Sequence, residues 1–249
     1  MADDFLIATE LSKSFGGIQA VNGVSFTIGR GEIFSLLGPN GAGKTTTIRM
    51  FSTVLAPDAG DVEIGGHSVL DASDEVRKLI GVCPQELALY EELSATDNLV
   101  FFGRMAGLGR REARDAAAVN LAVVGLESRA KDAIKTFSGG MKRRVNIAIA
   151  LMSKPALLFL DEPTVGIDPQ SRNHIFDTAL SLRDEGVTVL YTTHYMEEAD
   201  RLCDRIGVMD HGELIALGTP DELKARVGPP DQVTLEEMFL SLTGRSLRD

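Results

Sequence analysis

The chain has 249 residues, of which 44% are hydrophobic and 24% are charged, so its composition is that of a globular protein with a substantial core. A formal net charge of −11 is opposite in sign to a surface that binds DNA or RNA, and we expect no nucleic-acid partner. No apolar run approaches the ~20 residues of a membrane-spanning helix, and the first residues are acidic where a secretory signal is basic, which predicts a cytoplasmic protein.

The first third of the chain alternates short apolar, β-rich runs with glycine-containing turns. The runs cover residues 5–9, 24–28, 32–37 and 62–64. Such runs between turns predict a small, largely antiparallel β layer. The run at 32–37 also leads into a glycine-rich loop, after which residues 46–53 are expected to form a helix.

The middle of the chain differs in composition and in the spacing of its apolar residues. Between residues 95 and 126, Ala, Arg, Glu and Leu recur at helical spacing, and Gly107 with Gly109 mark a break between two helices. We therefore expect a helical lobe over about residues 88–150.

Beyond the lobe, continuous apolar runs at 157–160 and 187–191 predict strands buried on both faces of a parallel sheet, with a helix at 169–183 between them. The last part is expected to contain, in order, a hairpin over 205–217 that turns at 210–213, a helix at 220–226, a linker at 228–231 and a short helix opened by a capping box at Thr234. We expect one domain over residues 1–227, followed by a linker and short helix over 228–249.

The glycine-rich loop fits the phosphate-binding pattern G-x-x-x-x-G-K-S/T in full and lies between a predicted strand and a predicted helix. Its glycines let backbone N–H groups turn towards phosphate oxygens, and the helix N-terminus favours an anion. Lys44 is expected to contact the β- and γ-phosphates of ATP, and the Thr45 hydroxyl is expected to bind Mg²⁺. The nucleotide contacts expected here are Gly38, Pro39, Asn40, Gly41, Ala42, Gly43, Lys44, Thr45 and Thr46.

Two carboxylates follow the apolar run at 157–160, at the edge where open α/β sheets bind their ligands. Asp161 is expected to hold Mg²⁺, and Glu162 is expected to act as general base on the attacking water. By itself, an acidic pair at the end of a strand is as often a helix cap in a solvated turn as it is a catalytic site. The phosphate loop upstream favours the catalytic interpretation.

Together with Phe137-Ser138-Gly139-Gly140-Met141, these motifs resemble the nucleotide-binding domain of the ABC ATPase family over residues 5–227. The resemblance implies an α/β fold, with a P-loop NTPase (RecA-like) core, an antiparallel β layer and a helical signature lobe. The family signature is usually Leu-Ser-Gly-Gly-Gln. Phe137 and Met141 depart from it, while the Ser-Gly-Gly centre is intact.

The resemblance also assigns roles to single residues. It places Phe15 under the adenine ring, with Val21 nearby, although a phenylalanine is also a common core residue. It gives Gln85 a contact with Mg²⁺ and the attacking water, and places Asp168 in a loop that crosses between subunits. His194 would contact the γ-phosphate; a lone histidine is more often structural, but its position after a predicted strand favours function.

Partners follow from the same resemblance. Ser138, Gly139 and Gly140 would reach the nucleotide of an opposite subunit, so a homodimer or a pair with another ABC ATPase would hold ATP and Mg²⁺ between the chains. An integral membrane transporter subunit would keep this dimer at the inner face of the cell membrane. Its docking surface is expected over residues 87–99, with Leu87, Leu89, Tyr90 and Leu93 as anchors, unless these side chains pack inside the lobe.

Three stretches resemble the daunorubicin-resistance type of exporter: residues 137–144, 193–200 and 234–245. Residues 13–21 also resemble branched-chain amino-acid importers, so an importer is an alternative. Another alternative is an ABC ATPase that acts in DNA repair or on the ribosome and not in transport. Such proteins usually carry long coiled-coil insertions or two cassettes per chain, and this sequence has neither. A nucleotide sensor that does not hydrolyse ATP is disfavoured by the presence of Glu162 and His194.

Two features are expected to be structural. Cys83 and Cys203 lie far apart without metal or redox spacing, which favours small buried side chains. The basic run at 142–144 is expected to form a solvated helix face, with a contact to phosphate or anionic lipid as the alternative.

Overall fold

A computed structural model describes residues 4–244, so the first three residues and Arg245 of the exporter-like tail lie outside the described residues. The chain divides into two compact units, Met1–Arg77 with Thr188–Asp249, and Lys78–Val187. No helix within the described range is long and apolar enough to cross a membrane.

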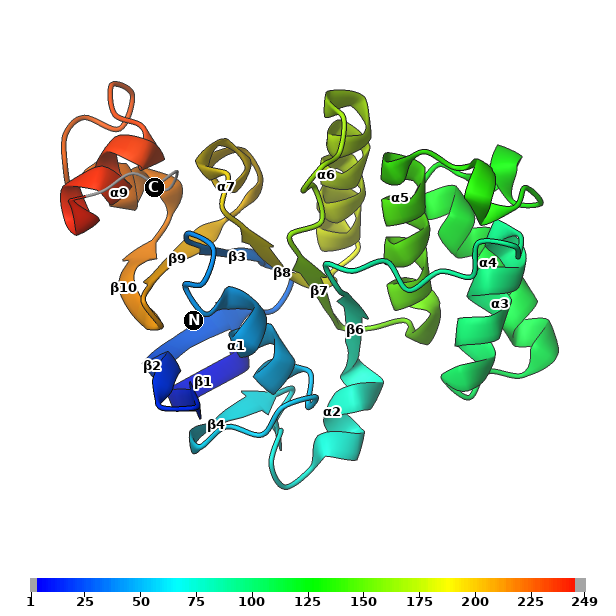
Figure 1. Cartoon of the computed structure of the whole chain (residues 1–249), viewed down its shortest axis with the longest axis horizontal. Helices are drawn as coiled ribbons and strands as arrows, with labels where there is room; N and C mark the ends of the chain where they lie inside the picture. The colour runs from blue at the N-terminus through cyan, green and yellow to red at the C-terminus, as the bar shows by residue number, and fades with distance from the viewer. Residues whose placement is uncertain (1–3, 245–249) are drawn as a thin grey trace. The chain divides into compact units, whose positions relative to one another are not determined.

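The first unit contains the predicted antiparallel layer (Figure 1, blue to cyan). Its strands lie in the order β2-β1-β4-β5, and neighbouring strands are antiparallel. Their bounds are β1 (Asp4–Phe15), β2 (Ile18–Gly29), β4 (Ala59–Ile64) and β5 (His67–Ser68). Buried and exposed positions interchange along β4, as expected for a sheet with one face on the core.

The strand before the glycine-rich loop does not belong to that layer, so its assignment to the antiparallel layer was wrong. β3 (Ile33–Leu37) pairs in parallel with β8 (Thr188–Thr193) and with β9 (Arg205–Asp210). Every residue of β3 and β8 is buried. A run without polar alternation is typical of a strand covered on both faces, and this distinguishes β3 from the layer strands.

The rest of the first unit follows the predicted order. β9 and β10 (Glu213–Gly218) form the expected antiparallel hairpin, in which Asp210 is the partner of Glu213. Thr234 and Glu237 form the expected capping box at the start of the last helix, which lies against α7 and α8. The helices are α1 (Lys44–Phe51), α7 (Met196–Leu202), α8 (Pro220–Lys224) and α9 (Leu235–Thr243).

The second unit combines a parallel strand pair with helices (Figure 1, green to yellow). The predicted break between two helices is present, with Gly107 in a left-handed conformation. The elements are β6 (Ile80–Cys83), α3 (Ala95–Met105), α4 (Arg110–Val123), α5 (Gly139–Ala150), β7 (Leu157–Asp161) and α6 (Pro169–Asp184). The short helix α2 (Ser73–Leu79) and β6 lacked a clear sequence pattern, because α2 buries only Val76 and β6 is interrupted by Gly81.

The expectation of a solvated basic face on α5 was wrong for two of its three residues. Arg143 and Arg144 are only 5% and 9% exposed. Their guanidinium groups donate to main-chain carbonyls, whereas Lys142 forms an ion pair with Glu91 nearer the surface. Most of α5 from Arg143 onwards is buried, so long basic side chains at these positions satisfy backbone acceptors.

The two cysteines have the expected structural character. Cys83 and Cys203 are buried and unpaired with each other. Burial raises the pKa of the Cys83 thiol to about 11 and also raises that of Cys203. Both thiols are therefore protonated and unreactive at neutral pH.

Candidate functional site

The phosphate loop in the first unit is closely approached by neighbouring main chain at two of its glycines. A Cβ atom at Gly38 would collide with the carbonyl oxygen of Met209, and one at Gly43 would collide with that of Ala20. Gly43 also has a φ of 102° at the N-terminal end of α1, a conformation that favours glycine. The main chains of β9 and β2 therefore approach the loop so closely at these two positions that only glycine fits.

Lys44 opens α1 and is almost fully buried. Its Nζ donates to the carbonyl oxygens of Gly38 at 2.8 Å and Pro39 at 3.1 Å, so the cation lies inside the curve of the loop. Thr45 and Thr46 follow in the first turn and are half-buried. A cation, a hydroxyl and a helix N-terminus at one loop fit the phosphates of a nucleotide and its Mg²⁺.

His194 lies beside this loop because of strand register. In the parallel pair β3–β8, Leu37 is the partner of Thr193, and the Gly38 N–H donates to the Thr193 carbonyl at 3.3 Å. His194 is the next residue along the chain and is half-buried. The structure thus brings the predicted γ-phosphate contact to the loop that is predicted to bind the phosphates.

The two predicted adenine contacts differ in their surroundings. Val21 is buried on β2, and its Cγ2 would lie 3.4 Å from a Cβ at Gly43, so it borders the phosphate loop. Phe15 ends β1 and is 49% exposed, with the Lys13 ammonium 5.8 Å from its ring centroid. Exposure excludes the core interpretation of Phe15.

In the second unit, Asp161 ends β7 and Glu162 follows it; both are buried. Glu162 has a φ of 45°, a left-handed conformation that is strained for a residue with a side chain. In the parallel pair β6–β7, Cys83 is the partner of Leu160, so Gln85 emerges beside Glu162. The Gln85 Nε2 donates to the Glu162 Oε2 at 3.3 Å.

The signature residues lie at the start of α5, close to Asp168. Ser138 is the N-cap of this helix and accepts from the Met141 N–H, while Gly139 is exposed with open space around its Cα. A Cβ at Gly140 would collide with Ser171 and would lie 3.3 Å from the Asp168 Oδ2. Asp168 in turn is the N-cap of α6, and the backbone N–H of Ser171 lowers the pKa of its carboxyl.

Sequence reasoning missed one residue beside His194. Glu198 is buried on α7, and its Oε2 accepts from the Tyr191 hydroxyl and the Thr193 hydroxyl, both at 2.9 Å. The Thr193 Oγ1 also accepts from the Tyr195 N–H. Both neighbours of His194 are thus held through one carboxylate. The only sequence signal was a glutamate on the inner face of a short helix.

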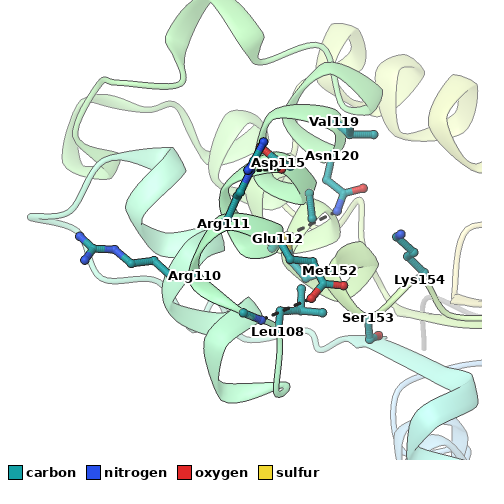
Figure 2. A pocket seen from close by; sticks show the side chains of 12 residues that line it. Leu108, Arg110, Arg111, Glu112, Asp115, Val119, Asn120, Met152, Ser153 and Lys154 are labelled. Carbon is teal, nitrogen blue, oxygen red and sulfur yellow. Dashed lines mark hydrogen bonds and ion pairs between the residues drawn. The ribbon is translucent and has the colours of Figure 1, made fainter.

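A cavity of about 890 Å³ opens elsewhere in the second unit, between α4 and the turn at 151–154. Figure 2 shows that side chains of α4, such as Asn120, lie opposite Met152 and Lys154. None of the predicted nucleotide or metal contacts lines it.

Residues 21–165 match the family model described as ABC transporter. The chain is 54% identical over 223 residues to the linearmycin resistance ATP-binding protein of Bacillus subtilis (strain 168), covering 90% of this chain and 72% of that protein. It is 46% identical over 228 residues to a daunorubicin resistance ATP-binding protein of Streptomyces coeruleorubidus, covering 92% and 72%.

Solved structures agree with these matches. An ATP-binding subunit of an ABC transporter aligns with a TM-score of 0.84 at 30% identity, over 96% of this chain and 99% of that one. A dimeric ATP-binding cassette in a post-hydrolysis state with ADP and Pi aligns with a TM-score of 0.77 at 28% identity, over 86% and 98%. The α/β fold with a P-loop core is thereby confirmed, and the chain belongs to the ABC transporter family as an ATP-binding subunit with ATPase activity.

Proposed function

We propose that this chain powers a membrane exporter of lipophilic, drug-like antibiotics. The observation that carries the proposal is 54% identity to a linearmycin resistance protein, together with 46% identity to a daunorubicin resistance protein. These relatives favour the exporter over the importer alternative.

Binding is assigned to the first unit. The phosphate loop supplies backbone N–H groups, Lys44 supplies a cation to the β- and γ-phosphates, and Phe15 offers an exposed ring to adenine. Thr45 and Asp161 would hold Mg²⁺, with Gln85 as a further ligand. The metal neutralises charge on the β- and γ-oxygens when bound.

Hydrolysis is assigned to Glu162, with His194 on the γ-phosphate. Glu162 is buried, held by the Gln85 amide and placed on a strained backbone, which is typical of a residue whose carboxylate must be aimed. As general base it would take a proton from the attacking water. Glu198 would keep His194 in place through Thr193 and Tyr195.

A second chain would complete each site. The exposed start of α5, with Ser138 as N-cap and Gly139 open, offers a helix N-terminus that fits a phosphate. We infer that it reaches the γ-phosphate of an opposite subunit, so that ATP and Mg²⁺ join a homodimer or a mixed pair. The post-hydrolysis dimer among the similar structures supports this arrangement.

The membrane subunit is expected to dock near Tyr90, where apolar side chains are exposed. Tyr90 is 49% exposed and packs edge-on against Phe101 at 4.9 Å between ring centroids. Leu87 and Leu93 are also exposed, while Leu89 is only half-exposed. Such a patch fits an apolar helix of a membrane partner, which would hold the chain at the inner face of the membrane.

The catalytic assignment predicts that Glu162→Gln keeps ATP affinity but lowers turnover by about 100-fold or more, because the base is lost. Size-exclusion chromatography with ATP and Mg²⁺ should show a persistent dimer. Lys44→Ala is the matched control, since it removes the phosphate cation and should abolish both nucleotide binding and the dimer. A Glu162→Gln protein that hydrolyses ATP at the parental rate would refute the assignment.

For Glu198, we expect Glu198→Ala to lower kcat by about tenfold with little change in the KM for ATP, because His194 loses its support while the phosphate loop is intact. Glu198→Gln should restore most of the rate, since one amide oxygen can accept both hydroxyls. Steady-state ATPase assays check this. Full turnover in Glu198→Ala would show that Glu198 is only a packing residue.

The docking assignment predicts that Tyr90→Asp leaves the ATPase of the purified chain intact but reduces its recovery with membranes and its antibiotic resistance phenotype. The Asn98 amide binds the backbone N–H and carbonyl of Tyr90, so the backbone should keep its place after the change. Val119→Asp, at another exposed apolar position, is the control. If Tyr90→Asp sediments with membranes and confers resistance as the parent does, docking occurs elsewhere.

A further inference from the structure

Arg143 connects the signature helix to the residue that faces the proposed base. Its Nη1 donates to the Pro84 carbonyl at 2.8 Å and its Nη2 donates to the Gln85 carbonyl at 2.7 Å. We propose that Arg143 is a positioning residue that sets Gln85 beside Glu162 and so couples the orientation of α5 to ATP hydrolysis. This inference rests on the ATPase function proposed above.

The local chemistry explains why an arginine is needed. β6 ends at Cys83, and the two carbonyls that follow leave the strand pairing and require other donors. A guanidinium presents a rigid fork that reaches both, and charge-assisted hydrogen bonds of this kind are about twice as strong as neutral ones. Asn146, one turn further along α5, donates to the same Pro84 carbonyl at 3.3 Å. The start of α5 and the end of β6 are thus joined by several contacts.

The contact reaches the reaction through Gln85. The Gln85 Nε2 lies 3.3 Å from the Glu162 Oε2. Arg143 lies just over one turn after Ser138, so a tilt of the helix on which the signature sits would move both carbonyls with it. Helices move as rigid rods in such transitions. Binding of a nucleotide at the signature would therefore shift the Gln85 side chain, which holds the base.

The neighbouring Arg144 has a different partner, which makes it a matched control. It is on the same helix and similarly buried, but its Nη1 donates to the carbonyls of Val124 at 2.9 Å and Gly125 at 3.3 Å. These carbonyls belong to the C-terminal end of α4. Loss of Arg144 removes an equally buried cation without touching the Gln85 backbone.

The test measures kcat and KM for ATP with Mg²⁺, together with thermal stability, in the full chain. Arg143→Met should lower kcat by about tenfold or more with KM within about twofold, because a small misplacement of a catalytic group is costly while the phosphate loop is unchanged. Arg143→Lys should retain a kcat between those of Arg143→Met and the parent, since one ammonium cannot reach both carbonyls equally. Arg144→Met should lower thermal stability but keep the parental kcat.

A double-mutant cycle with Gln85→Ala decides whether the effect passes through Gln85. The double variant should be no slower than Gln85→Ala alone. Additive losses, a parental kcat in Arg143→Lys and Arg143→Met, or the same loss of kcat in Arg144→Met would each overturn the inference. Full turnover in Gln85→Ala would also overturn it while leaving the ATPase function standing. A parental chain without ATP turnover would instead overturn the proposed function, and this inference with it.

Discussion

The close approach of two main-chain carbonyls to the phosphate loop is the constraint on which the nucleotide site depends. The carbonyl of Ala20 on β2 and that of Met209 on β9 occupy the space that side chains at positions 43 and 38 would need. β2 of the antiparallel layer and β9 of the hairpin therefore both shape the loop, although β9 lies far from it in sequence. Their packing requires glycine at both positions, and Lys44 places one buried cation within the loop.

The signature segment at residues 138–140 is also shaped by a close contact at a glycine. Gly140 lies against Ser171 and Asp168, so side chains from the start of α6 fill the space that a side chain at position 140 would need. Because Asp168 caps α6 and Ser138 caps α5, both polar side chains are held at helix ends. The segment proposed to face a second nucleotide and the loop proposed to cross to the second subunit thus form one local structure. A shift of either helix would move both.

The features that could be predicted from the sequence are those that depend on a few consecutive residues. The phosphate loop, the capping box at Thr234 and the buried run before Asp161 were recognisable because each depends on local pattern. β3 was assigned to the wrong layer, because a five-residue apolar run does not reveal its partners. Arg143 and Arg144 were wrongly expected to be solvated, and Glu198 was missed, for the same reason: a charged residue is recognised as buried only when its distant acceptors or donors are known.

Three of the buried cations, Lys44, Arg143 and Arg144, differ in the kind of contact that each makes. Lys44 binds the carbonyls of Gly38 and Pro39 through one ammonium with rotatable donors, so phosphate oxygens can replace those carbonyls without a change in the backbone. Arg143 and Arg144 bind carbonyls through planar forks, which lose their contacts only if the helix or its partner moves. Under the proposed function, Lys44 therefore stands where a contact is exchanged when phosphate binds. Arg143 and Arg144 stand where a contact persists, which in the proposed coupling transmits movement of α5.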